Sequence, residues 1–117
     1  MKINAYRFGH IEIEGSSYDS DVIITPDKVN HGWWRKQGHS LHRDDLDEVD
    51  EVVKAKPEKL IVGTGYYGQM KIPEETRQYL AQHNINLISA KTADAVDQFN
   101  RLQQECANIV AALHLTC

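Results

Sequence analysis

The chain has 117 residues, 41% of them hydrophobic, with 13 basic and 17 acidic side chains and a net charge of −4. This is the composition of one globular domain, which buries a core without disulfides or metal, and it excludes wholesale disorder. The acidic balance argues against binding to the nucleic-acid backbone, and no secretory signal or apolar run of ~20 residues is visible. We therefore expect a soluble, cytoplasmic protein that binds neither nucleic acid nor a membrane.

The first third of the sequence has the pattern of antiparallel β-structure. A short first strand is expected to end before Gly9, and apolar and acidic residues then alternate over 11–14, which is typical of a half-buried strand. Residues 15–17 have the composition of a turn, and a third strand is predicted at 22–25. Large side chains at 29–34 indicate a fourth strand.

The apolar spacing changes to a helical period after Gly38. A helix is predicted at 46–53, with acidic residues crowding its start and Pro57 preventing its continuation. The continuous apolar run at 60–62 is typical of a strand that is covered on both faces.

Helices and strands alternate through the rest of the chain. Pro73 opens a second helix, and Asn84 is expected to end it in a left-handed conformation. A strand is predicted at 85–89, after which Thr92 is expected to cap a third helix. The apolar segment 109–115 is the last predicted strand.

This order of elements predicts an α/β fold. A β-hairpin region followed by the order αβαβαβ is typical of a three-layer domain with a mixed central sheet that is parallel at its centre, here with an antiparallel β portion at the N-terminus. No linker or repeat interrupts the sequence, so we expect residues 1–117 to form a single domain. Six residues are expected to be nearly fully buried in one sheet: Ile61, Val62, Ile88, Ile109, Val110 and Leu113.

Several short motifs stand together in order and spacing. They are Ser-Asp-Val-Ile-Ile-Thr at 20–25, Trp-Arg-Lys-Gln-Gly-His at 34–39, Lys-Pro-Glu-Lys-Leu-Ile-Val-Gly-Thr-Gly at 56–65, Phe-Asn at 99–100 and Val-Ala-Ala-Leu-His-Leu-Thr-Cys at 110–117. Together they resemble the Mth-938-like domain family over nearly the whole chain. The resemblance implies an α/β fold with a mixed central sheet, no established enzyme activity or cofactor, and assembly or regulatory roles through partners in its eukaryotic branches.

A glycine-containing turn follows the strand at 60–62. Glycines at the carboxyl end of a strand let a backbone approach a ligand, and free N–H groups there bind anions. Residues 63–68 match G-x-G-x-x-G, but the next helix is delayed and no acidic residue ends the next strand, so a tight turn is the simpler interpretation. The alternative is an anion-binding cleft formed by Gly63, Thr64, Gly65, Tyr66, Lys91 and Thr92, with Arg35 and Lys36 nearby.

Arg35 and Lys36 belong to a local basic cluster with His39, His42 and Arg43. Such a cluster can hold a phosphate or carboxylate, or face an acidic partner. A solvated loop whose charges offset the acidic start of the next helix is the favoured interpretation.

No metal site and no catalytic group of residues is predicted. His114 and Cys117 are three apart, and on a strand residues at that spacing face opposite sides, which disfavours both a shared ion and a Cys-His nucleophile. Any chemical role of these two residues stays open, and no cofactor is expected. Cys106 and Cys117 are expected to be reduced and unpaired. Asn100 lies near the inner face of the third predicted helix, where a buried amide is expected to bind a loop carbonyl or amide.

Trp33 and Trp34 are adjacent, so on a strand one faces inward and the other is a candidate for a partner surface. Our leading hypothesis is a non-enzymatic protein-binding or assembly-assisting module with an unidentified protein partner. The alternative is a small-molecule or anion-binding protein, or an enzyme, with its cleft at 63–65. A flat apolar patch around the tryptophans favours the first and a deep polar pocket at the strand ends favours the second. The oligomeric state is left open.

Overall fold

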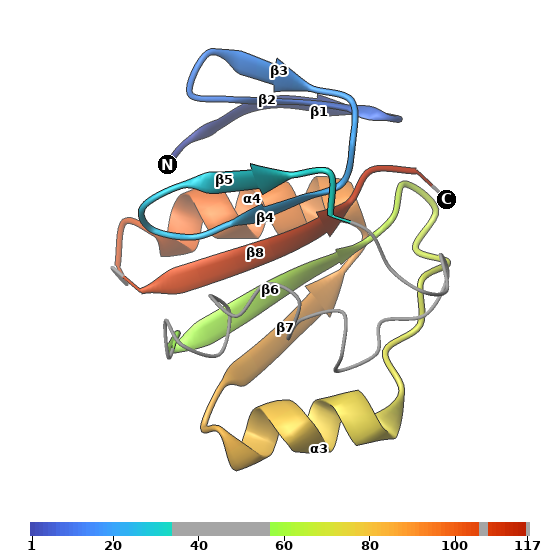
Figure 1. Cartoon of the computed structure of the whole chain (residues 1–117), viewed down its shortest axis with the longest axis vertical. Helices are drawn as coiled ribbons and strands as arrows, with labels where there is room; N and C mark the ends of the chain where they lie inside the picture. The colour runs from blue at the N-terminus through green and yellow to red at the C-terminus, as the bar shows by residue number, and fades with distance from the viewer. Residues whose placement is uncertain (34–56, 106–107, 117) are drawn as a thin grey trace.

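The computed structural model describes residues 1–33, 57–105 and 108–116 (Figure 1). The elements in chain order are β1 (Ile3–Arg7), β2 (His10–Ile13), β3 (Ser16–Tyr18), β4 (Val22–Ile24), β5 (Val29–His31), β6 (Lys59–Thr64), α3 (Glu74–Gln82), β7 (Asn86–Ala90), α4 (Thr92–Leu102) and β8 (Ile109–His114). Among these described residues no helix is long and apolar enough to cross a membrane.

The strands form a five-stranded mixed sheet and a separate three-stranded antiparallel sheet. The large sheet has the order β5-β4-β8-β6-β7. Strands β8, β6 and β7 are parallel neighbours, whereas β4 runs antiparallel to both β8 and β5. The predicted α/β fold with a mixed sheet, parallel at its centre, is therefore confirmed.

Side chains along the central strands alternate between two apolar cores, as the pleat of a strand requires. One core takes Val22, Ile24, Ile61, Ile109, Ala111 and Leu113 from the large sheet. The other takes Ile23, Leu60, Val62, Val110 and Ala112 from the same strands. The large sheet is thus buried on both faces, which explains why its central strands are continuous apolar runs.

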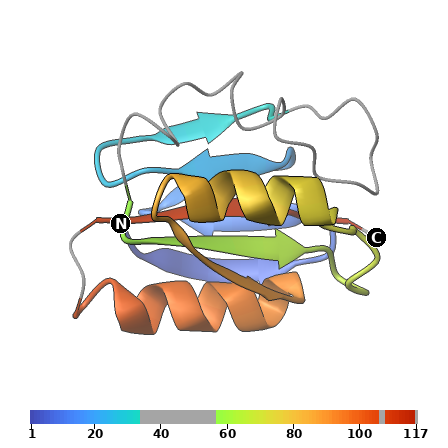
Figure 2. The ribbon, with the colours of Figure 1, turned by 90° about the horizontal axis from the view of Figure 1, so that it is seen from below.

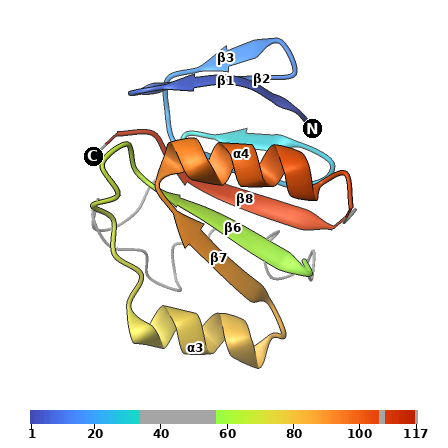
Figure 3. The same ribbon diagram turned by 180° about the vertical axis from the view of Figure 1, so that it is seen from behind.

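Different elements cover the two faces. Helix α4 and the three-stranded sheet pack on the first face, through residues such as Phe99 and Ile11. Helix α3 lies along β7, and its Tyr79 and Leu80 contribute to the second core, to which Trp33 also belongs (Figure 1). Figure 2 shows α4 along one side of the strands, and Figure 3 shows it on the near side of the large sheet, between β8 and the three-stranded sheet.

The N-terminal sheet contains one strand more than the sequence predicted. The turn between β2 and β3 is made by Glu14 and Gly15, whose φ angles of 49° and 81° lie in the left-handed region. Ser16 and Ser17, predicted as part of that turn, instead begin β3 and pair with β2. The turn is therefore shorter than its composition indicated, because only two residues need the left-handed conformation.

Two further predictions about strands are wrong. The strand predicted at 29–34 ends at His31, because Gly32 has a φ of 75° that leads the chain out of the extended conformation. Ile88 is only half-buried, since β7 is an edge strand of the large sheet, whereas the other five predicted core residues are buried. The predictions of a helix at 46–53 and of two unpaired cysteines at 106 and 117 fall outside the described residues.

Truncating a side chain in the middle of β6 tests the buried sheet. Ile61 is fully buried between β7, β8 and α4, so Ile61→Ala is expected to lower the free energy of unfolding by roughly 2–5 kcal/mol. The matched control is Ile88→Ala on the half-buried edge strand, for which we expect under about 2 kcal/mol. Urea denaturation of both variants measures the difference, and equal losses would contradict a fully covered centre.

Candidate functional site

The strands β6 and β7 end side by side, which brings the two loops predicted to form a site together. Their parallel register pairs Gly63 with Ala90. The Thr64 hydroxyl donates a hydrogen bond to the carbonyl oxygen of Ala90 at 3.0 Å. The turn after β6 therefore lies against the start of α4, as expected for carboxyl ends of adjacent parallel strands.

The hydroxyl of Thr92 joins three segments at this edge of the sheet. It donates to the carbonyl oxygen of His114 at 2.6 Å and accepts from the backbone N–H of Gly65 at 2.9 Å. Thr92 is fully buried and is the first residue of α4, with Lys91 in the capping position and no side-chain cap bond. The prediction that Thr92 caps this helix is therefore wrong, because its hydroxyl is used to hold the ends of β6 and β8.

Gly63 is required by close packing at the same point. A Cβ on Gly63 would lie 2.8 Å from the Thr92 hydroxyl oxygen and 3.1 Å from the Thr92 Cα. The second distance cannot be relieved by rotating a side chain, since it involves backbone. The first glycine of the predicted turn thus makes room for Thr92.

The backbone N–H groups of this edge donate to oxygens of the protein itself. The N–H of Gly65 donates to the Thr92 hydroxyl, and that of Tyr66 donates to the carbonyl oxygen of Thr116. The N–H groups of Gly68 and Thr92 both donate to the carbonyl oxygen of Gly65. The side chain of Lys91 lies against Gly68. Binding of an anion to residues 63–66, 91 and 92 stays a prediction, and Arg35 and Lys36, also assigned to that cleft, lie outside the described residues.

A second polar group at this edge, which sequence reasoning missed, consists of Asp21 and His114. One carboxylate oxygen of Asp21 lies 2.8 Å from His114 Nδ1, and the other accepts from the backbone N–H of Leu115 at 2.7 Å. The imidazole is buried, and the two residues are 93 positions apart in sequence, so no local pattern links them. Cys117, considered with His114 at the sequence level, lies outside the described residues, and no cluster of three metal-binding side chains occurs within the described part.

Tyr6 ties the three-stranded sheet to the end of β8. Its hydroxyl donates to the carbonyl oxygen of Leu115 at 2.9 Å. Burial raises the pKa of Tyr6 to about 12, because the charged phenolate is poorly solvated there. Tyr6 is therefore a neutral hydrogen-bond donor over the whole physiological range.

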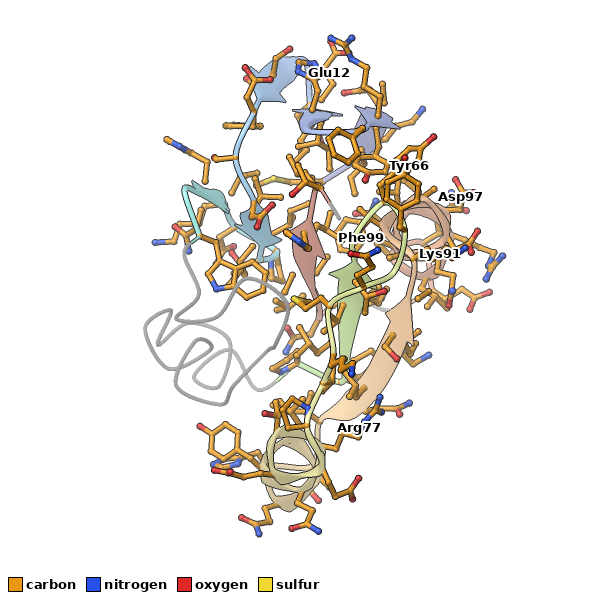
Figure 4. All side chains as sticks on the ribbon, turned by 90° about the vertical axis from the view of Figure 1, so that its right-hand side faces the viewer. Glu12, Tyr66, Arg77, Lys91, Asp97 and Phe99 are labelled. Carbon is orange, nitrogen blue, oxygen red and sulfur yellow. The ribbon has the colours of Figure 1, made fainter. Side chains whose placement is uncertain are left out.

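Large aromatic side chains are exposed directly beside this polar edge. Phe8, Tyr66 and Tyr67 are 53%, 45% and 62% exposed, and we call these three residues the aromatic patch. The Phe8 and Tyr66 rings are 5.6 Å apart and the Tyr66 and Tyr67 rings 5.0 Å apart, both nearly perpendicular. In Figure 4, Tyr66 lies on the face of the molecule that also carries Lys91 and Asp97.

The partner surface that the sequence pointed to, at Trp33 and Trp34, stays a prediction. Trp33 is only 7% exposed and belongs to the second apolar core. Trp34 lies outside the described residues. In the aromatic patch, Phe8 comes from the β1–β2 turn and the two tyrosines come from the loop after β6. The only sequence signal for this patch was the presence of three large aromatic residues in turns.

The prediction that Asn100 binds backbone is confirmed. Its side-chain oxygen accepts from the backbone N–H of Ile3 at 2.9 Å, and its side-chain nitrogen donates to the carbonyl oxygen of Ile3 at 2.8 Å. The partner is a strand rather than the expected loop. This pair of bonds attaches α4 to β1.

Comparison with known proteins identifies relatives over the whole length of the chain. Residues 3–114 match the family described as "Protein of unknown function (DUF498/DUF598)". A conserved hypothetical protein from Pyrococcus horikoshii is 26% identical, with a TM-score of 0.83 and full coverage of both chains. A protein of Bartonella henselae described as an outer membrane protein is 27% identical, with a TM-score of 0.80 and coverage of 98% of this chain and 94% of its own.

A third structure supports the fold assignment. A Mth938-like domain protein from Bordetella pertussis is 20% identical, with a TM-score of 0.79 and coverage of 97% of this chain and 85% of its own. Together with the family match, this likeness confirms the resemblance to Mth-938-like domains inferred from the sequence motifs.

Replacing the hydroxyl of Thr92 tests the junction at the sheet edge. Thr92→Val keeps the shape but leaves the Gly65 N–H and the His114 carbonyl without this partner, so we expect a loss of at least about 2 kcal/mol in the free energy of unfolding. The control Thr92→Ser keeps the hydroxyl and should lose about 1 kcal/mol for one buried methyl. Denaturation curves distinguish the two, and a Val variant as stable as the Ser variant would show that the hydroxyl is unimportant.

Alkaline pH tests the environment of Tyr6. An unfolded tyrosine ionises near pH 10, whereas the folded-state pKa is about 12. The stability that Tyr6 contributes is therefore fully present below about pH 10 and is lost as the pH rises towards 12. Tyr6→Phe should be less stable at neutral pH by roughly 1 kcal/mol, and the gap to wild type should close between those two pH values. A Tyr6 ¹³Cζ resonance that titrates near pH 10 would contradict this prediction.

Proposed function

This chain belongs to the DUF498/DUF598 family of proteins of unknown function, and we propose that it is a non-enzymatic protein-binding module that docks a partner protein on the aromatic patch. The observation that carries the proposal is the exposure of Phe8, Tyr66 and Tyr67 as one contiguous group. Such a module holds or assembles a partner without acting on it chemically. The cytoplasm is the compartment we propose, since the two cysteines form no disulfide framework in the sequence.

The physical argument for docking rests on the cost of leaving these rings in water. Each buries a large apolar area on contact, and tyrosine is enriched among the residues that dominate binding energy. The rings pack edge to face on one another, so they lose little further conformational freedom when a partner covers them. Tyr6 lies next to this group, with its ring centroid 6.4 Å from that of Tyr66.

The polar groups of the adjacent edge support a binding module over an enzyme. The Thr92 hydroxyl and the Thr64 hydroxyl each donate to a backbone carbonyl oxygen, and the turn amides donate within the protein. These bonds fix the loop that carries Tyr66 and Tyr67. A rigid loop lowers the entropic cost of binding, which is what a docking surface needs.

Site-directed photo-cross-linking tests the proposal in the source cell. A photoreactive phenylalanine analogue at position 67 should give a discrete adduct with a partner protein. The matched control places it at Gln78, an exposed position on α3 away from the aromatic patch. We expect the adduct at position 67 to fall at least about fivefold when Phe8→Ser and Tyr66→Ser are added, since loss of such contacts costs about 1–2 kcal/mol each.

Folding of the variants is checked in parallel, because all three rings are exposed and the substitutions should change the free energy of unfolding by only about 0.5 kcal/mol each. An adduct that forms equally well from position 78, or that survives loss of Phe8 and Tyr66, would contradict docking at the aromatic patch.

A further inference from the structure

Two consecutive residues after β8, Leu115 and Thr116, bind both parts of the chain that carry the aromatic patch. The carbonyl oxygen of Leu115 accepts a hydrogen bond at 3.0 Å from the backbone N–H of Gly9, the residue after Phe8. The carbonyl oxygen of Thr116 accepts from the backbone N–H of Tyr66 at 3.3 Å. In Figure 1 the chain after β8 passes between the three-stranded sheet and the loop after β6. The placement of Phe8 relative to Tyr66 therefore depends on where this segment lies.

Asp21 holds this segment from the start of β4. Strands β4 and β8 pair antiparallel, with Val22 opposite Leu113. Continued by one position, this register places Asp21 opposite His114. One carboxylate oxygen of Asp21 accepts from the N–H of Leu115 at 2.7 Å, and the other lies 2.8 Å from His114 Nδ1. Hydrogen bonds to a carboxylate are among the stronger ones in proteins, so Asp21 anchors the segment at its first residue.

The surroundings of Asp21 strengthen this anchor. The side chains of Asp21 and His114 are only 15% and 6% exposed, so water competes little for their hydrogen bonds. Burial is the largest cause of the raised pKa of Tyr6, and the nearby charge of Asp21 raises that pKa further. The Tyr6 hydroxyl binds the same Leu115 carbonyl oxygen that accepts from Gly9. Asp21 and Tyr6 thus hold Leu115 by its N–H and by its carbonyl group respectively.

We propose that Asp21 is a positioning residue for the docking surface and that it acts through the segment 115–116. The inference rests on the proposed function, because it takes the aromatic patch as the surface that contacts a partner. Without the carboxylate, the N–H of Leu115 loses this acceptor and the segment is released on that side. The two carbonyl oxygens that bind Gly9 and Tyr66 then no longer hold these residues at a fixed separation, and the rings of the patch move apart.

The arrangement of the rings is measured first, by NMR of the whole chain. Nuclear Overhauser effects between the rings of Phe8 and Tyr66, whose centroids are 5.6 Å apart, report the packing of the patch. Asp21→Ala should abolish these effects. The amide protons of Gly9 and Tyr66 should exchange roughly fivefold faster relative to that of Val62 in β6, which is the effect of about one hydrogen bond. Val62 is the internal reference, because a general loss of stability would speed up exchange at all three amides.

Two matched variants separate the anchoring role of Asp21 from its charge. Asp19→Ala removes a carboxylate that also lies 2.7 Å from a histidine, His10, but Asp19 is 84% exposed, and the ring packing should not change. Asp21→Asn keeps an oxygen that accepts from the Leu115 N–H, so it should retain the ring packing that Asp21→Ala loses. If Asp21→Ala is unfolded in buffer, all variants are compared in concentrated sucrose, which favours the folded state.

Docking is measured next, through the photo-adduct at position 67. Asp21→Ala should lower the adduct about threefold or more, as expected for a residue that acts on a site indirectly, whereas Asp21→Asn and Asp19→Ala should keep it. Ring packing that survives Asp21→Ala, or an adduct that Asp21→Ala leaves unchanged, overturns the inference while docking on the patch stands. If the wild-type sequence gives no specific adduct, docking on the patch fails, and the ring packing and amide exchange alone decide whether Asp21 positions the patch.

Discussion

One buried hydroxyl holds together the edge of the sheet on which every candidate surface depends. Thr92 Oγ1 joins the end of β8 to the turn after β6 from its own place at the start of α4. Its position is possible only because Gly63 has no Cβ. The loop bearing Tyr66 and Tyr67 and the helix bearing Asp97 are thereby fixed to the same point. The orientation of the aromatic patch relative to α4 is therefore set by local geometry and not by long, flexible connections.

The small N-terminal sheet is attached by hydrogen bonds that supplement its apolar contacts. Tyr6 binds the carbonyl oxygen of Leu115, and Asn100 binds both backbone groups of Ile3. Asp21, at the start of β4, binds the N–H of Leu115 and the imidazole of His114. The segment after β8 is thus held from both the small sheet and the large sheet. Because Tyr6 is neutral below its raised pKa, its bond remains intact throughout the physiological range.

The sequence predicted the fold well because its main determinants are local. Continuous apolar runs such as 60–62 and 109–113 indicate doubly covered strands, and both are buried in the large sheet. Asn100 was predicted correctly, since a polar amide near an apolar helix face must find backbone partners. Thr92 was assigned the wrong role, because a residue at a helix start has the same sequence pattern whether its hydroxyl caps the helix or binds elsewhere. The aromatic patch was missed, since Phe8 and Tyr66 are brought together only by the tertiary fold.

The packing of the aromatic patch determines what it would contribute to recognition. Rings that are already packed on one another lose little entropy on binding, so the patch is suited to supplying affinity with modest selectivity.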